Sequence, residues 1–189
     1  MPSMPKPNAV LASLTIAAAA SLAGLSGCAA GDLSQTDRDV LESRAGDALD
    51  EFTAEANVRR FLDDAHGYAI FPNVTKGAFG VGGARGRGLV YEQGRLIGNA
   101  VLTQASIGFQ LGGQTFQELI LFEDQQALDR FTRGNLEFDA GASAVAGTAG
   151  GATTINYDNG VAVFVRTNAG LMYEASIGGQ NFSFNAIDD

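Results

Sequence analysis

The stretch FPNVTKGAFGVGGARGRGLV, residues 71–90, combines six glycines with three basic residues in an otherwise acidic chain. Glycine beside arginine is compatible with a loop that cradles a phosphate, with a β-hairpin, and with a surface that binds an anion. The choice among these three decides both the fold and the function expected for the 189-residue chain.

The phosphate-loop interpretation fails on spacing. A Walker loop requires a lysine directly after a glycine, but Lys76 follows Thr75. A dinucleotide fingerprint that begins at Gly80 and Gly82 requires glycine at position 85, where this chain has Arg85. Neither nucleotide motif is present, so a hairpin or an anion-binding surface remains.

The hairpin interpretation explains more of the pattern. In an unbroken strand Phe79 and Val81 would lie on the same face as Arg85 and Arg87, because side chains alternate with a period of two. Apolar core residues and two arginines do not share a buried face comfortably. We therefore expect Gly82-Gly83 to form a turn or bulge that resets the register. Beyond it, both arginines project from one side, and the alternating glycines leave the other side bare.

Positive charge is concentrated around this hairpin. Between residues 75 and 95 there is one anion, Glu92, and there are four cations, namely Lys76, Arg85, Arg87 and Arg95. A local charge of about +3 in an acidic chain focuses anion binding on one patch. Arginine suits phosphate, because its planar donor fork meets the oxygens in pairs. The alternative, a solvated hairpin whose charges prevent edge-to-edge aggregation, stays open.

The first 27 residues have the pattern of an export signal. Lys6 precedes an uncharged apolar run, Val10 to Leu25, which is shorter than the roughly 18 residues of a transmembrane helix. The residues Leu25-Ser26-Gly27-Cys28 resemble the lipobox of bacterial lipoproteins. That resemblance implies cleavage before Cys28 and a diacylglyceryl group on its thiol. An ordinary secretory signal with an incidental cysteine is the alternative.

A lipidated Cys28 would tether the protein to a membrane, because two or more acyl chains anchor stably. Cys28 is the one cysteine of the chain, so an intrachain disulfide is excluded. In lipoproteins an aspartate just after the cysteine favours retention at the inner membrane. Ala29 stands there instead, so we expect an outer-membrane location facing the periplasm of the bacterial envelope.

The remaining chain is long enough for one domain. We expect a lipidated tether over residues 28–35 and a single domain over residues 36–189. Without Lys6 the chain keeps 11 basic residues against 21 acidic ones, a net charge of −10. A protein this acidic is a poor binder of nucleic acid.

Two helices are predicted before the strands begin. Ser34 provides an N-cap, and Asp37 adds a favourable charge in the first turn. The apolar positions that follow at helical spacing are Leu41, Ala45, Ala48, Leu49 and Phe52. A second helix is expected over residues 54–65 and ends at Gly67; it buries Val58, Phe61, Leu62 and Ala65.

From Tyr68 onward the period changes to two, which indicates strands separated by short turns. The first expected features are a turn at residues 91–95, a half-buried strand over residues 106–112 and a central strand at Glu118–Phe122. A short helix from Asp124 to Gly134 and a small-residue segment at Gly141–Gly151 are expected next. A turn at Asn159-Gly160 follows, and a last hairpin turns near residues 168–170 and ends at Phe184. The pattern predicts an α+β fold, with N-terminal helices on a curved, glycine-rich antiparallel sheet or barrel and one short helix inserted.

The motifs around the opening stretch resemble those of the SYLF domain family. They are AHGYAIFPNV at residues 65–74, KGAFGVGG at 76–83 and RGRG at 85–88, and the likeness extends over residues 40–187. The resemblance implies a lipid-binding domain. Eukaryotic members bind phosphoinositide membranes and some bind actin filaments, whereas bacterial members are commonly exported lipoproteins. Actin does not suit an exported bacterial protein.

The chain departs from the family pattern at several positions. His66 stands where the family often has lysine, so this charge depends on pH. Gly141 and Thr148 replace a usual aspartate and proline, which weakens any binding role for that segment. The basic amphipathic helix of eukaryotic members is absent; the acidic N-terminal helix and the lipid anchor take its place.

These features favour a membrane-anchored, non-catalytic module that binds anionic lipid head groups through Lys76, Arg85, Arg87 and Arg95, with Phe71 or Phe79 as apolar support. A structural lipoprotein that meets an envelope protein, without lipid selectivity, is the alternative. Catalysis is disfavoured, because His66 has no serine or cysteine nucleophile in a recognisable arrangement. The acidic residues lack ligand spacing, so we expect no metal and no cofactor.

Overall fold

The computed structural model describes residues 33–79, 81–107, 114–134, 157–167, 170–174 and 179–187. Several sequence predictions lie outside these residues: the export signal, the lipidated Cys28 and most of its tether, most of the strand expected over residues 106–112, the small-residue segment Gly141–Gly151, and part of the turn expected near residues 168–170.

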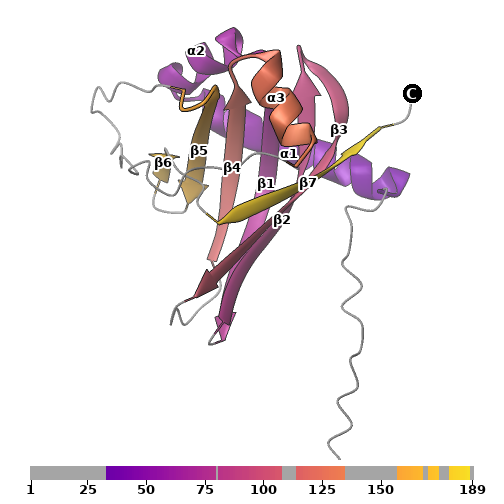
Figure 1. Ribbon diagram of the computed structural model, residues 1–189, viewed down its shortest axis with the longest axis vertical. Coiled ribbons are helices and arrows are strands. Elements are labelled where there is room, and N and C mark those ends of the chain that lie inside the picture. The colour runs from indigo at the N-terminus through magenta and orange to yellow at the C-terminus, as the bar shows by residue number, and fades with distance from the viewer. Residues whose placement is uncertain are drawn as a thin grey trace, which may run out of the picture.

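The described chain forms three helices and seven strands in an α+β arrangement, as the sequence predicted (Figure 1). In chain order they are α1 (Gln35–Thr53), α2 (Ala56–Asp64), β1 (Gly67–Phe79), β2 (Val81–Glu92), β3 (Arg95–Ile107), β4 (Gln114–Phe122), α3 (Gln125–Thr132), β5 (Val161–Thr167), β6 (Gly170–Glu174) and β7 (Gln180–Ala186).

The seven strands form one antiparallel sheet in the order β6-β5-β4-β1-β2-β3-β7. Strands β6 and β7 are its edges, so the sheet is open, and of the two architectures expected it is the curved sheet. Figure 1 shows α1 and α2 behind the sheet, and α3 in front, where β7 crosses over the other strands. The C-terminal strand therefore leaves the β5–β6 edge and pairs with β3 at the opposite edge.

Helix α1 begins where its cap residue predicts. The Ser34 hydroxyl accepts the Asp37 N–H at 3.2 Å and donates to Asp37 Oδ2 at 2.6 Å. The expected apolar stripe faces the sheet, with Ala45, Ala48 and Phe52 buried. Helix α2 is shorter than expected. It ends because Ala65 is extended, and Gly67 already belongs to β1 rather than stopping the helix.

The sheet separates two apolar layers. One lies under α1 and α2 and includes Phe52, Val58 and Leu89. The other lies between the sheet, α3 and β7, where Phe131 of α3 stacks at a tilt on both Phe122 and Phe182, with ring centroids 5.0 and 5.1 Å apart. Aromatic burial on this scale anchors α3 and β7 to the front of the sheet.

The hairpin at the opening stretch is more regular than expected. Phe79 pairs with Val81, and Gly82 and Gly83 are paired strand residues. The predicted turn or bulge at Gly82-Gly83 is therefore wrong. The register shift lies in β1 instead, between Ile70 and Asn73, where proline interrupts the ladder.

No reset is needed because α1 covers only part of the β2 face that carries the arginines. Leu89 on this face is buried in the layer under the helices, whereas Arg85 and Arg87 are exposed. One strand face thus passes from core to solvent along its length.

The glycine side of β2 is not bare. A Cβ built on Gly88 would lie 2.6 Å from Cδ1 of Phe71, and one on Gly86 would lie 2.7 Å from Cγ2 of Val74. Both of these side chains are fully buried. The alternating glycines therefore let the core side chains of β1 pack directly on the backbone of β2.

Local turn and cap signals are confirmed at three positions. Gln93-Gly94 and Asn159-Gly160 both have positive φ angles, as the tight turns require. The Asp124 carboxylate caps α3 by accepting the Ala127 N–H at 2.7 Å.

Candidate anion-binding face

The structure brings two of the four candidate cations together. Arg85 and Arg87 are two residues apart on β2 and project from the same exposed face. Their cross-strand neighbours on β1 are Thr75 and Asn73, both uncharged and exposed. The guanidinium groups are therefore not buried against internal carboxylates.

The other two candidates lie elsewhere. Lys76 pairs with Ala84, whose side chain is in the front core layer, so Lys76 is on the opposite face of the sheet. Arg95 pairs with Glu92 at the other end of β2, five residues beyond Arg87, or roughly 17 Å along the strand. The four cations expected as one patch thus occupy three places.

The environment of Arg85 and Arg87 differs from that of most other arginines. Arg59 donates to Thr53 O, Arg130 to Asn159 O, and Arg166 to both Glu51 O and the Glu51 carboxylate. Over the described residues, no hydrogen bond or ion pair engages the side chains of Arg85 and Arg87. Their donors are available to a ligand.

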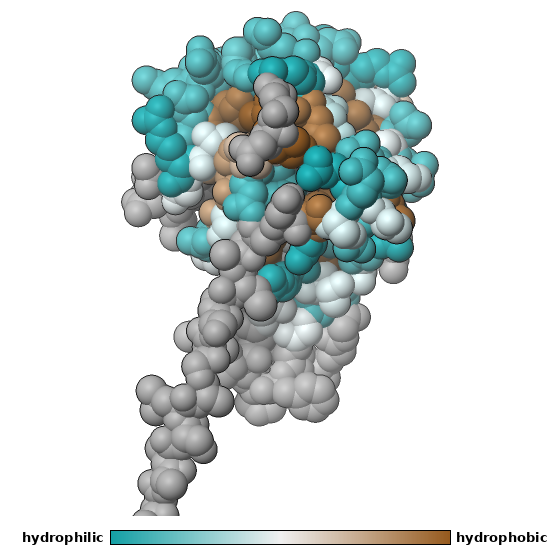
Figure 2. Space-filling view, turned by 90° about the vertical axis from the view of Figure 1, so that its right-hand side faces the viewer, coloured by the Kyte–Doolittle hydropathy of each residue, from teal (hydrophilic) through white to brown (hydrophobic). Residues whose placement is uncertain are grey.

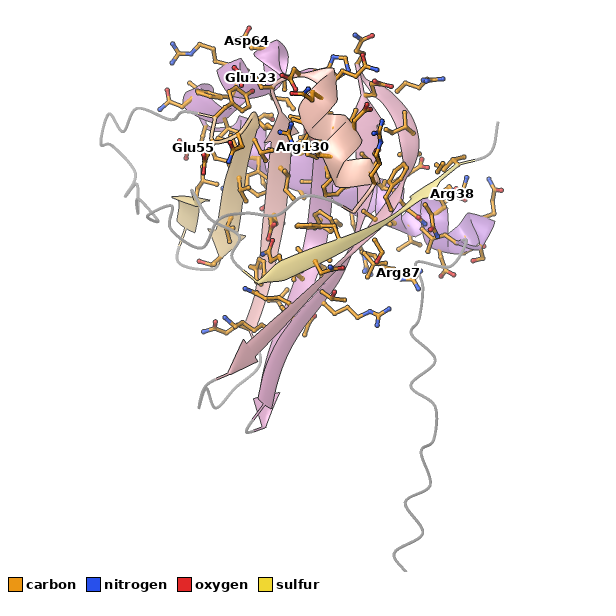
Figure 3. All side chains as sticks on the ribbon, viewed as in Figure 1. Arg38, Glu55, Asp64, Arg87, Glu123 and Arg130 are labelled. Atoms are coloured by element: carbon orange, nitrogen blue, oxygen red, sulfur yellow. The ribbon has the colours of Figure 1, made fainter. Side chains whose placement is uncertain are left out.

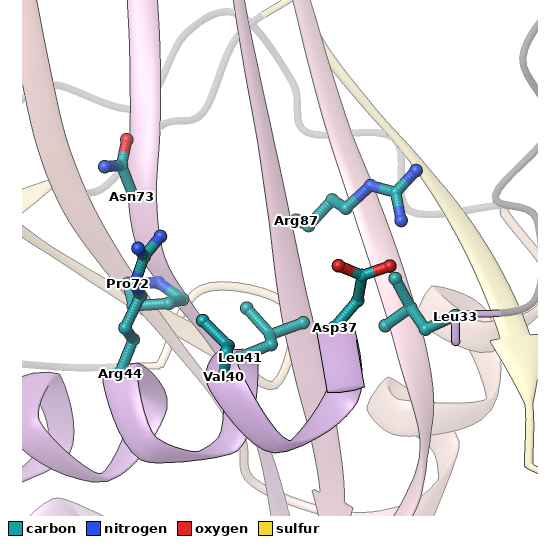
Figure 4. Close-up of a pocket in the computed structure, with 8 residues that line it drawn as sticks. All are labelled: Leu33, Asp37, Val40, Leu41, Arg44, Pro72, Asn73 and Arg87. Carbon is teal, nitrogen blue, oxygen red and sulfur yellow. The ribbon is translucent and has the colours of Figure 1, made fainter. Parts of the chain in front are cut away.

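A cavity of about 500 Å³ lies beside Arg87, between the first turns of α1 and strands β1 and β2 (Figure 4). It is lined by Leu33, Asp37, Val40, Leu41, Arg44, Pro72, Asn73 and Arg87. Its walls combine apolar side chains with two guanidinium groups and one carboxylate.

Arg44 is the residue that sequence reasoning missed. It lies on α1, seven residues after Asp37, and the described part of the chain offers its side chain no ion pair or hydrogen bond. Its helical spacing from Leu41 was visible in the sequence. Its place beside β1 and β2 depends on how α1 crosses the sheet.

The remaining sequence candidates have structural roles. Phe71 is fully buried in the core and cannot support a surface contact; the Phe79 side chain lies outside the described part. His66 Nε2 lies 3.0 Å from Glu92 Oε1, and the His66 carbonyl accepts the Gln93 N–H. His66 therefore ties the start of β1 to the β2–β3 turn rather than joining the arginines.

Three labelled acidic side chains lie away from this face. Figure 3 shows Glu55, Asp64 and Glu123 toward the end of the molecule formed by α2 and the start of α3, apart from Arg87. Figure 2 shows that the side of the molecule near β3, β7 and the start of α1 has an apolar area with a hydrophilic border. The described surface is thus uneven in polarity.

Within the described ranges, no group of three or more His, Cys, Asp or Glu side chains could hold a metal ion. None of the helices in those ranges combines the length and apolarity needed to cross a bilayer.

Part of the chain matches the model of a known family. The Ysc84 family model, described as Las17-binding protein actin regulator, matches residues 103–186. The Ysc84 family is the SYLF domain family, so the SYLF resemblance is confirmed over these residues. The SYLF match covers strand β3 from Thr103, strands β4 to β6, helix α3 and β7.

A curated relative matches a longer stretch of the chain. The chain is 27% identical over 134 residues to beta cell expansion factor A of Aeromonas veronii. The match covers 69% of this chain and 50% of that protein, so the chain spans about half of the relative's length.

Proposed function

We propose that this protein is a bacterial lipoprotein that binds anionic lipid head groups without catalysing a reaction. Cys28 carries the anchor, and the folded body faces the periplasm from the outer membrane. Arg85 and Arg87 make the electrostatic contact. The SYLF match supports a binding role.

One observation carries the proposal: two neighbouring arginines stand exposed on one strand face, and no described residue forms a hydrogen bond or ion pair with their side chains. An acidic protein is repelled by an anionic surface unless its cations are concentrated and face that surface. Each basic residue near an anionic membrane contributes about 1 kcal/mol. The β-strand projects both side chains from the same face, so one surface can meet both.

The test measures binding of the body without its anchor to lipid vesicles. All described elements and both core layers lie within residues 33–187, so a chain that starts at residue 28 and carries Cys28→Ser contains the described fold. We expect it to sediment with vesicles that contain anionic phospholipid and not with neutral phosphatidylcholine vesicles. Binding should weaken as the salt concentration rises.

Two double variants with the same charge change locate the contact. Arg85→Glu/Arg87→Glu should weaken binding by about thirtyfold, because two contacts of about 1 kcal/mol each are lost. Lys76→Glu/Arg95→Glu should keep affinity within about threefold, because these residues are on other surfaces. Equal loss in both variants, or no binding by the unaltered body, would contradict the proposal. A specific envelope protein crosslinked in intact cells, without lipid selectivity, would favour the structural alternative.

A further inference from the structure

The cavity beside Arg87 is elongated along α1. Asp37, Val40, Leu41 and Arg44 follow the i, i+3, i+4, i+7 spacing of one helix face. Seven residues of helix span about 10 Å. Figure 4 shows Arg44 and Arg87 toward different ends of this row, with Val40 and Leu41 between them.

This arrangement separates two cationic groups by an apolar floor. Arg44 comes from the helix and Arg87 from the strand, so the two are held by different elements of one rigid body. A single phosphate bound at one end would leave the other guanidinium without an anion. Two phosphates joined by a short linker would satisfy both donor forks.

The other lining groups add hydrogen-bond acceptors and an apolar contact. Asp37 reduces the net charge of the cavity to +1, so its attraction for a single anion is weaker than that of two guanidinium groups alone. Its Oδ2 atom already accepts the Ser34 hydroxyl at 2.6 Å, and a carboxylate can accept further bonds from a linker hydroxyl. Val40 is 46% exposed, and it offers an apolar contact to the first carbons of an acyl chain.

We propose that this cavity binds a glycerophospholipid head group that carries two phosphates on a short, hydroxylated linker. Arg44 binds one phosphate and Arg87 the other. The inference rests on the proposed function and narrows it, because it names the class of lipid and adds Arg44 to the binding residues.

The proposed anchor would favour this site. Leu33, at one end of the cavity, is five residues after Cys28, a span of at most about 18 Å. A lipid on Cys28 would hold the cavity near the head groups and raise their effective concentration.

The experiment compares two anionic lipids at equal surface charge. The body from residue 28, with Cys28→Ser, is titrated with vesicles of phosphatidylcholine that contain either cardiolipin or twice that fraction of phosphatidylglycerol. We expect cardiolipin vesicles to bind at least about fivefold more tightly, as one additional charge-assisted contact predicts. Thermal unfolding of each variant confirms that it is folded.

Three single variants remove one charge each. Arg44→Gln and Arg87→Gln should each abolish the preference for cardiolipin. Arg85→Gln is the matched control: it lies on the same strand face but does not line the cavity, so it should weaken binding to both lipids and keep the preference.

The outcomes separate the two proposals. Binding to both anionic vesicles without preference would overturn the two-phosphate inference and leave the proposed function standing. Preference that persists in both Arg44→Gln and Arg87→Gln would overturn it as well. Displacement from cardiolipin vesicles by low concentrations of inorganic pyrophosphate would assign the site to a soluble ligand instead. No binding to any anionic vesicle would remove both proposals together.

Discussion

Gln180 on β7 donates its side-chain amide to Glu118 Oε2 on β4 at 3.1 Å. Three strands, β1, β2 and β3, separate these two strands in the sheet. The bond is possible because the sheet curls until its β7 edge lies over β4. Glu118 is fully buried there, so this hydrogen bond links β4 and β7 across the front of the core.

Replacing Gln180 tests the contribution of this hydrogen bond to stability. Gln180→Leu removes a donor from a buried carboxyl group, and we expect the free energy of unfolding to fall by about 1–3 kcal/mol. Asn181→Leu is the matched control on the same strand, because Asn181 is exposed and surface changes stay within about 0.5 kcal/mol. Denaturant unfolding followed by circular dichroism measures both. Equal stability of the two variants would show that the hydrogen bond between Gln180 and Glu118 does not stabilise the fold.

A glycine pair tests the close packing of β1 on β2. Gly88→Ala places a Cβ 2.6 Å from both Phe71 Cδ1 and the Ile70 carbonyl oxygen, and we expect a loss of about 3 kcal/mol from overpacking. Gly77→Ala meets no atom within 4 Å and should be close to neutral. Chemical denaturation of the two alanine variants gives the comparison. A neutral Gly88→Ala would contradict the packing described for this hairpin.

Alkaline pH should destabilise the folded protein through its partly buried tyrosines. Burial, assisted by neighbouring Tyr91, raises the pKa of Tyr68 from 10.0 to about 12. Because the folded pKa exceeds the unfolded one, the stabilisation is complete below pH 10 and is lost as the pH rises toward 12.

Tyr68→Phe keeps the ring that stacks on Tyr91 with centroids 4.8 Å apart and removes the titrating hydroxyl. The fall in melting temperature between pH 8 and pH 11 should therefore be smaller in this variant. An unchanged pH dependence would mean that Tyr68 ionises as readily in the folded protein as in the unfolded chain.

Much of the fold could be predicted from local pattern. The Ser34 and Asp124 caps, the Asn159-Gly160 turn and the buried Glu118–Phe122 strand each depend on residues close in sequence. The predicted turn or bulge at Gly82-Gly83 was wrong. The period of two shows which residues share a strand face, but it does not show how much of that face a helix covers.

The candidate site was predicted only in part for the same reason. Arg85 and Arg87 share a face through strand periodicity alone. The place of Arg44 in one cavity with Arg87 and the bond between Gln180 and Glu118 depend on tertiary arrangement. Lys76 was grouped with the arginines by sequence distance, although its strand partner puts it on the other face.

The anchor can be tested by mass. In cells that make lipoproteins, the mature protein should begin at Cys28 with the added mass of acyl groups, and globomycin should leave the precursor uncleaved. Cys28→Ser should block that processing. A mature N-terminus at another residue without lipid would instead fit an ordinary secretory signal.

The central claim, that the exposed arginine face meets the anionic surface, is tested most directly by a polarity-sensitive fluorophore. Because Cys28 is the one cysteine, a cysteine introduced into the Cys28→Ser body accepts a single label. One variant is Thr103→Cys on β3, where Thr103 pairs with Arg85 of β2, and the other is Asp63→Cys on α2. Both positions are exposed. With anionic vesicles, the emission should shift to the blue from residue 103 and stay constant from residue 63. A shift at residue 63 alone, or at neither position while the protein is bound, would contradict the claim.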